Sequence, residues 1–173
     1  MTGPQALRRY FGGNVKAMRR FLNRLQAKGL ITLSTELVRD RQETESPIAV
    51  IQLGSVFPPA EQVAYKAAQL WLDSTTPKLI IRGTVSLATL YGSEIRTVAS
   101  ANLSHEVALV GIILNKLETN PDCEFRLLQS KPGGGAFPDA IFASAQIELV
   151  GRYSGAMVAA KMVLAARANL EFW

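Results

Sequence analysis

Two carboxylate residues in the last third of the chain have the types and spacing of a metal-binding pair. Asp139 falls in an expected strand over 137–142, and Glu148 falls in the next expected strand, over 145–150. Neighbouring strands of a sheet bring such side chains together, and carboxylate oxygens are the ligands that Mg²⁺ prefers. A magnesium ion held there can activate water and polarise a phosphate. The pair is a candidate catalytic and metal site, with magnesium as the cofactor if it is active and no cofactor otherwise.

Two more polar residues are candidates for the same site. His105 and Glu106 stand at the start of a helix expected over 104–117, which the topology would bring near the carboxylates. A neutral histidine at this place can donate a hydrogen bond to a carboxylate or contact a phosphate. The alternative, given equal weight, is a histidine that makes a structural hydrogen bond at the end of the helix.

The third element of a nuclease motif is missing from this region. A proline followed by Asp139, and then Glu148, resembles the motif of the PD-(D/E)xK nucleases, in which a lysine two residues after the second acid steadies the nucleophile. Val150 occupies that position here, so Arg152 or Lys161 would have to substitute. Arginine stays charged and is a poor proton acceptor. We therefore favour an inactive nuclease-like fold over an active nuclease, with the two acids as surviving features of the fold or as ordinary turn and edge residues.

These candidates need an α/β framework, and hydrophobic periodicity predicts one. A glycine-rich loop over 131–136 joins two of its strands and lacks the Gly-Lys-Ser/Thr ending of a phosphate-binding loop. The expected order is one helix, three strands, a second helix and a last strand, over 104–117, 124–128, 137–142, 145–150, 156–168 and 169–173. This order predicts a small α/β domain with a mixed sheet.

Positive charge is concentrated at the start of the chain. The net charge is +5, and residues 1–31 hold seven basic residues and no acid. Residues 51–173 hold ten basic and ten acidic residues, so they contribute no net charge. Such an asymmetry indicates an anionic partner for the first third of the chain alone.

A helix, a glycine turn, a basic amphipathic helix and a hairpin are expected in this first third. The helices are expected over 4–11 and 14–28. The first strand of the hairpin is expected to start with residues 30–33, the polar tip to cover 36–46, and the second strand to cover 47–53. This is the layout of a winged helix-turn-helix, whose second helix enters the major groove of double-stranded DNA. The alternative is a solvated basic helix with no partner. The expected DNA contacts are Lys16, Arg19, Arg20 and Arg24 on the second helix and Arg39 and Arg41 at the hairpin tip.

The chain is therefore expected to be α+β or α/β, with two domains and a connection. A partial winged-helix segment spans 1–54, a linker and connecting helix span 55–77, and the nuclease-like domain spans 78–173. A helix over 60–72, a strand over 78–81 and a helix over 84–91 are expected between the two ends.

Composition excludes several other classes of protein. Hydrophobic residues make up 48% of the 173, enough for a packed core. No apolar run approaches the roughly 20 residues that span a bilayer. No signal peptide is expected, so the cytoplasm is the default location and no membrane partner is expected. The single cysteine, Cys123, excludes an internal disulfide and a cysteine-based zinc site, and the single histidine makes a histidine-rich metal site a poor fit.

Six segments, in their order and spacing, carry a resemblance that spans nearly all of the chain. They are LRRYFGGNVKAMRRFLNRLQAKGLI, LATLYG, SHEVALVGIIL, FPDAIF, IELVGRYS and ANLEFW. Together they resemble the replication-relaxation-type winged-helix proteins of plasmids and other mobile elements. The resemblance implies a winged helix joined to a degenerate PD-(D/E)xK-like domain, with His105, Asp139 and Glu148 as the polar positions of that family.

Three functions are compatible with these patterns. The leading expectation is a DNA-binding accessory protein of a mobile element, acting in replication, transfer or operon control, with an inactive nuclease-like domain. The first alternative is a magnesium-dependent DNA nuclease that uses Asp139 and Glu148. The second is an interaction module in a larger nucleoprotein assembly. In the second alternative, the truncated winged helix docks on a protein or a guide RNA. In the DNA-binding interpretation, a protein partner or a second copy of the chain is a candidate source of the helix that normally precedes such a helix pair.

Overall fold

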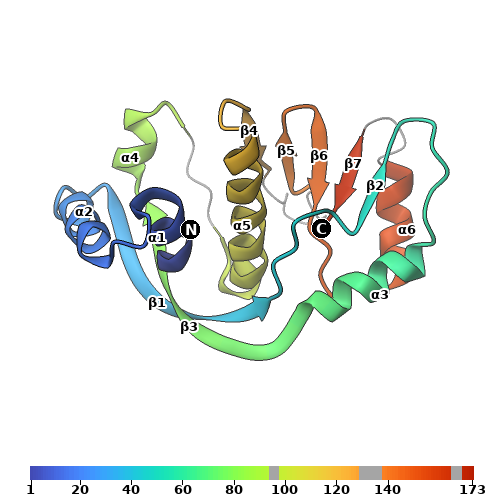
Figure 1. Cartoon of the computed structure of the whole chain (residues 1–173), viewed down its shortest axis with the longest axis horizontal. Coiled ribbons are helices and arrows are strands. Elements are labelled where there is room, and N and C mark those ends of the chain that lie inside the picture. The colour runs from blue at the N-terminus through green and yellow to red at the C-terminus, as the bar shows by residue number, and fades with distance from the viewer. Residues whose placement is uncertain (94–97, 129–137, 165–168) are drawn as a thin grey trace. The chain divides into compact units, whose positions relative to one another are not determined.

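The structure, a computed structural model, describes residues 1–93, 98–128, 138–164 and 169–173 (Figure 1). These residues form two compact units, and each unit is assembled from two separate segments of the chain. The first unit consists of Met1–Arg39 and Ser74–Leu114, and the second consists of Asp40–Asp73 and Asn115–Trp173. The sequence-based division ran instead in consecutive blocks. The expected glycine-rich loop over 131–136 lies outside the described residues.

Two helices separated by a glycine turn open the first unit. They are α1 (Gly3–Phe11) and α2 (Val15–Ala27). Asn14 caps α2 as expected, because its side-chain oxygen accepts a hydrogen bond from the backbone N–H of Ala17 at 2.9 Å. Gly12 ends α1 with a φ of 50°, a left-handed conformation that glycine adopts without steric cost.

The rest of the first unit is a two-stranded sheet and three helical segments. β1 (Ile31–Arg41) pairs with β3 (Trp71–Gly83), and α4 (Val85–Leu90), the 3-10 helix η1 (Ser100–Asn102) and α5 (Leu103–Thr119) follow. The last two residues of β1, the first three residues of β3 and the last residues of α5 belong to the second unit. Among the described residues, no helix is both long enough and apolar enough to cross a membrane. Among the described residues of this unit, one buried cluster consists of Ala6, Met18, Leu22, Ile31 and Ile81, and another consists of Val38, Ile80, Leu103 and Val107.

The predicted hairpin is wrong. Residues 36–41, expected at a polar tip, continue β1, and residues 47–53 contribute β2 (Ala49–Ile51) to the sheet of the second unit. Alternation of residue types predicts that a strand forms, but the partner of the strand depends on packing with distant parts of the chain. Arg39 and Arg41 therefore lie on β1 and not at a hairpin tip.

The second unit is built on a five-stranded mixed sheet with the order β2-β7-β6-β5-β4 (Figure 1). β4, β5 and β6 form an antiparallel meander, β7 lies parallel to β6, and β2 closes the edge antiparallel to β7. The four strands not yet bounded are β4 (Phe125–Leu127), β5 (Ala140–Phe142), β6 (Ala145–Glu148) and β7 (Leu170–Phe172). The expected order of the C-terminal elements is confirmed, and the class is mixed α+β.

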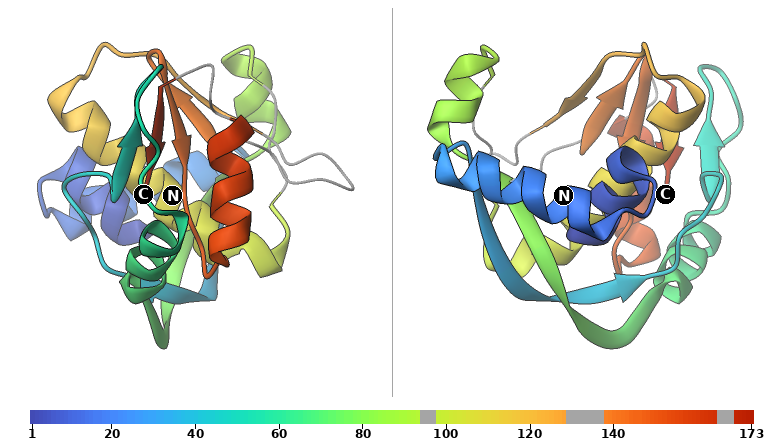
Figure 2. Two further views of the ribbon diagram at one scale, coloured as in Figure 1. Left: turned by 90° about the vertical axis from the view of Figure 1, so that its right-hand side faces the viewer. Right: turned by 60° about the vertical axis from the view of Figure 1, so that its left-hand side comes forward.

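Two helices pack together beside this sheet. α3 (Ala60–Leu70) and α6 (Gly155–Leu164) lie side by side in Figure 2. The indole N–H of Trp71, directly after α3, donates to the backbone oxygen of Val150 at 3.0 Å. The core that they share with the sheet consists of Ile51, Val63, Ala64, Ala67, Val150, Val158, Met162, Leu170 and Phe172.

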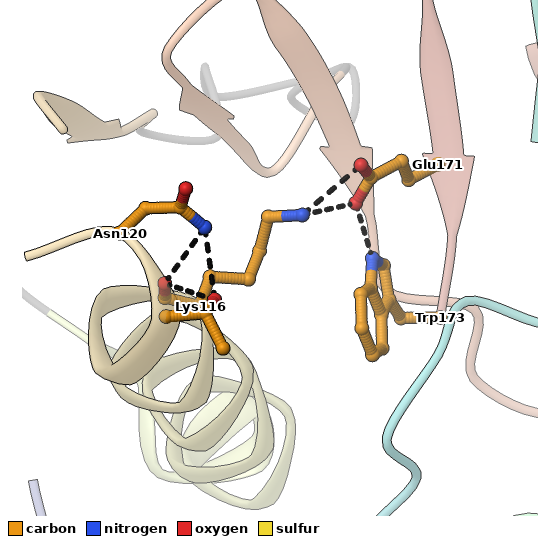
Figure 3. A network of polar contacts seen from close by, with 5 residues as sticks. Lys116, Asn120, Glu171 and Trp173 are labelled. Atoms are coloured by element: carbon orange, nitrogen blue, oxygen red, sulfur yellow. Dashed lines mark hydrogen bonds and ion pairs between the residues drawn. The ribbon is translucent and has the colours of Figure 1, made fainter.

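Lys116 is held on the other face of the sheet by an ion pair with Glu171 (Figure 3) and by contacts with two aromatic rings. Its ammonium lies 3.0 and 2.8 Å from the carboxylate oxygens of Glu171 and 5.2 and 5.5 Å from the ring centroids of Phe142 and Trp173. The Trp173 indole also donates to Glu171 at 2.9 Å. Successive residues of a strand point to opposite faces, so Phe172 joins the core with α6 while its two neighbours bind Lys116. These contacts give this face a structural role.

Candidate functional site

The register of two antiparallel strands brings Asp139 and Glu148 together. Ala140 of β5 lies opposite Ile147 of β6, and the Asp139 backbone N–H donates to the Ile147 oxygen at 2.9 Å. Asp139 and Glu148 are therefore the next opposed pair, and side chains of opposed residues share a face of the sheet. The sequence-based expectation that these two acids are neighbours is confirmed.

Both carboxylates are buried, and each has a polar or charged partner. Asp139 is 8% exposed, and one of its carboxylate oxygens accepts a hydrogen bond from the Leu149 backbone N–H at 2.8 Å. Glu148 has no exposed surface, and Lys161 of α6 forms an ion pair with it. Removing a charged carboxylate from water costs free energy, and a nearby cation offsets part of that cost. Lys161 therefore offsets part of the desolvation cost of Glu148.

Of the two basic residues considered as substitutes for a lysine at position 150, the structure brings Lys161 to the acids. Arg152 instead pairs with Asp73 at 2.5 Å and donates to the Trp71 backbone oxygen at 3.3 Å. Val150 itself is fully buried in the core.

Tyr153 completes this group, which we call the carboxylate cluster: Asp139, Glu148, Tyr153 and Lys161. The ammonium of Lys161 lies 5.1 Å from the centroid of the Tyr153 ring. Burial, followed by the negative charges of Glu148 and Asp139, raises the pKa of Tyr153 to about 12, so the phenol is neutral at physiological pH. The sequence reasoning missed Tyr153 because it sought a lysine at a fixed spacing. No local pattern in the sequence marks Tyr153 as a member of the cluster.

The cluster does not present a metal site in this arrangement. Within the ranges that the structure describes, no three His, Cys, Asp or Glu side chains gather closely enough to hold a metal ion. Two carboxylates are suitable ligands for magnesium. However, Glu148 has no exposed surface and pairs with Lys161, so a metal would have to displace the lysine.

The other two predicted site residues belong to a different unit. His105 and Glu106 lie in the first turns of α5 and are half-buried residues of the first unit, whereas Asp139 and Glu148 belong to the second unit. The carboxylate cluster is therefore described from residues of the second unit alone.

A second candidate site is the outer surface of α2. Met18 and Leu22 are buried against the core, and the helix contains no acidic residue. Four basic side chains occupy exposed positions on the rest of the helix, and we call them the basic face: Lys16, Arg19, Arg20 and Arg24. The prediction that these four residues lie outside the buried stripe is confirmed.

The two arginines predicted at the hairpin tip differ from each other in environment. Arg39 is exposed, and its backbone N–H donates to the Ser104 hydroxyl at 2.9 Å. The guanidinium of Arg41 donates to the Gln42 backbone oxygen at 3.2 Å, and its Nε and Nη2 atoms are shielded from solvent. Burial lowers the pKa of Arg41 to about 10. Arg41 therefore presents only part of its guanidinium to solvent.

No protein-family model matches the chain, and no curated protein or solved structure matches it either. Function must therefore be inferred from the two sites themselves.

Proposed function

We propose that the protein binds double-stranded DNA through the basic face of α2. The observation that carries this proposal is the exposure of four basic side chains on one helix, opposite buried Met18 and Leu22, in a segment without acids. Phosphates attract such a surface, and the counterions that they release on binding contribute to the affinity. The 13 residues of α2 span about 20 Å, and the major groove, about 12 Å wide, admits a helix.

The surroundings of α2 support a helix-turn-helix role. α1, a short turn at Gly12 and α2 form consecutive helices, as in DNA-binding proteins that place the second helix in the groove. The strands that follow are β1 and β3, which are distant in sequence, so the proposal gives the DNA contacts to α2 and not to a wing.

We assign a non-catalytic role to the second unit. Its strand order and its two opposed acids support a nuclease-like ancestry, but the buried pair of Glu148 and Lys161 leaves the acids inaccessible to a phosphate. Together with the resemblance to proteins of mobile elements, this supports an accessory role at DNA in replication, transfer or operon control.

The test is a binding titration on a random-sequence duplex over a range of salt concentrations. We expect affinity to fall steeply with salt, and the double variant Arg19→Ala/Arg20→Ala to bind more weakly with a shallower slope. The slope of log affinity against log salt should decrease by about 0.9 for each phosphate that the variant no longer neutralises, or about 1.8 for two.

The matched control changes the same charge elsewhere. The double variant Lys66→Ala/Arg126→Ala removes two exposed cations from α3 and β4 in the second unit. It should bind within about twofold of the wild type if the basic face is the contact surface. An equal reduction of affinity in the two double variants would show that net charge alone attracts DNA, and an absence of salt-sensitive binding would end the proposal.

A magnesium-dependent nuclease is the second candidate, because Lys161 of α6 pairs with Glu148 and so supplies a lysine that this chain lacks at position 150 of the motif. This candidate predicts cleavage of DNA only with magnesium or manganese, abolished by Asp139→Asn and by Glu148→Gln. Intact DNA in the presence of magnesium, at protein concentrations that saturate binding, would exclude it. Cleavage that survives both substitutions would come from a contaminant.

A further inference from the structure

A large aromatic side chain is exposed on the flank of the basic face. Phe21 of α2 is 49% exposed. Its ring packs against the ring of Phe11 at the end of α1, with centroids 5.6 Å apart and planes tilted by 55°. Phe11 is half-buried against the core of the first unit. The Phe21 ring is thus supported through Phe11, and half of its surface faces solvent.

The residues around this ring are apolar where they face the core and small or cationic elsewhere. Residues three, four and seven positions apart share a side of a helix. Met18 and Leu25, three residues before and four residues after Phe21, face the core. Ala17 lies four residues before Phe21, and the exposed Arg24 lies three residues after it. The exposed Lys28, which directly follows the end of α2, lies seven residues after it. The exposed residues that follow the ring on this side are therefore two cations, Arg24 and Lys28. No acid occurs in this segment, so the flank is apolar and positively charged at once.

We propose that Phe21 is a stacking platform for an unpaired base, so that the protein recognises DNA in which single-stranded bases adjoin the duplex bound by α2. This proposal rests on the proposed DNA binding and names the form of DNA more closely. Proteins that bind single strands combine cations that follow the backbone with aromatic rings on which bases stack. Arg24 and Lys28 would contact the phosphates that flank the stacked base.

Charge complementarity favours a nucleic acid over a protein as the occupant. An apolar protein surface would cover the ring but would leave Arg24 and Lys28 beside it without an anionic partner, unless it also carried acids. A nucleotide supplies a flat base and a phosphate within one residue, which matches a ring beside cations. Unpaired DNA is therefore the one occupant that uses both parts of this flank.

The test compares three labelled probes: a single strand, a blunt duplex, and a duplex with a single-stranded overhang. Phe21→Leu keeps an apolar side chain but removes the aromatic ring, whereas Phe21→Trp keeps an aromatic surface. We expect Phe21→Leu to weaken binding of the single strand and the overhang by about 5- to 150-fold, the range for one base that no longer stacks on a ring. Blunt-duplex affinity should stay within about twofold, and Phe21→Trp should restore the wild-type order of affinities. The salt dependence should not change, because no phosphate contact is removed.

The control is Tyr65→Leu, which removes an aromatic ring that is 64% exposed on α3 of the second unit. It should leave all three affinities unchanged. If Phe21→Leu binds every probe like the wild type while the wild type still binds blunt duplex, stacking is refuted and DNA binding stands. If Phe21→Leu weakens all three probes equally, Phe21 only supports α2, and stacking is again refuted. Self-association that depends on Phe21, with unchanged DNA affinities, would assign the flank to a second copy of the chain. A wild type that binds no probe would refute both proposals.

Discussion

The ion pair between Glu148 and Lys161 offers the sharpest test of the second unit. The perturbation is Lys161→Met, which keeps the unbranched apolar stem and removes the charge. Glu148 has no exposed surface, and the Lys161 side chain is only 16% exposed. Removing one partner of a buried pair leaves the other charge enclosed, which costs about 3–5 kcal/mol. The same substitution removes the cation–π interaction with the Tyr153 ring, which adds about 0.5–1 kcal/mol.

The reverse substitution should cost less. In Glu148→Gln, the remaining lysine can turn its ammonium toward water, because part of Lys161 is already exposed. In Lys161→Met, by contrast, the buried Glu148 carboxylate cannot turn toward water. The double variant Glu148→Gln/Lys161→Met contains neither charge, so it should recover most of the stability that Lys161→Met loses.

Urea denaturation followed by tryptophan fluorescence measures the unfolding free energies of these variants in the second unit. Both tryptophans of the chain, Trp71 and Trp173, belong to the second unit. A destabilisation below about 1 kcal/mol in Lys161→Met would refute the reasoning, because it would mean that Glu148 reaches water. If magnesium raises the urea midpoint of Lys161→Met but not that of the double variant, the carboxylates bind the metal once the lysine has gone, and the nuclease alternative gains support.

Three further outcomes are expected. Asn14→Ala should lower the free energy of unfolding by about 1 kcal/mol in urea melts followed by circular dichroism, because the Ala17 N–H no longer has its capping oxygen; an unchanged midpoint would contradict the cap. Trp71→Phe should cost about 1–3 kcal/mol in the same assay, since the enclosed backbone oxygen of Val150 loses its indole donor. In an alkaline ultraviolet titration, the wild type minus Tyr153→Phe difference should show one phenol with a pKa near 12. Because this pKa is raised, the neutral phenol contributes stability that is complete below pH 10 and is lost between about pH 10 and 12; a midpoint near 10 would show that the ring is solvated.

Local patterns in the sequence predicted the helices well, because their signals are local. The cap at Asn14 and the buried pair Met18 and Leu22 fix the start and the inner face of α2 without reference to any other element. Strand partners are not encoded in this way. β1 alternates apolar and polar residues over only part of its length, and its partner β3 begins 30 residues after β1 ends. The strand that became β1 was therefore predicted, but its partner was wrongly predicted to be residues 47–53 instead of β3.

The candidate site was predictable in its pairing but not in its burial. A short connection between two strands forces them to be antiparallel neighbours, so Asp139 and Glu148 could be placed together from spacing alone. The enclosure of Glu148 depends on where Lys161 and Tyr153 lie after α6 packs, and no local pattern specifies that. The burial of Asp139 and Glu148 therefore determines whether these acids can contact a phosphate, and the sequence alone does not predict it.

The division of the first unit into Met1–Arg39 and Ser74–Leu114 also governs how the chain can fold while it is being made. Ile81 of β3 completes the core on which α2 rests, and Ile80 completes the cluster that contains Leu103. When Ala27, the last residue of α2, has been added to the chain, Ile81 is still 54 residues away (81 − 27), so the apolar side of α2 lacks this part of its core until β3 has been made. A gene fragment that stops near residue 54 would never contain Ile81, so the apolar side of its α2 would stay partly uncovered.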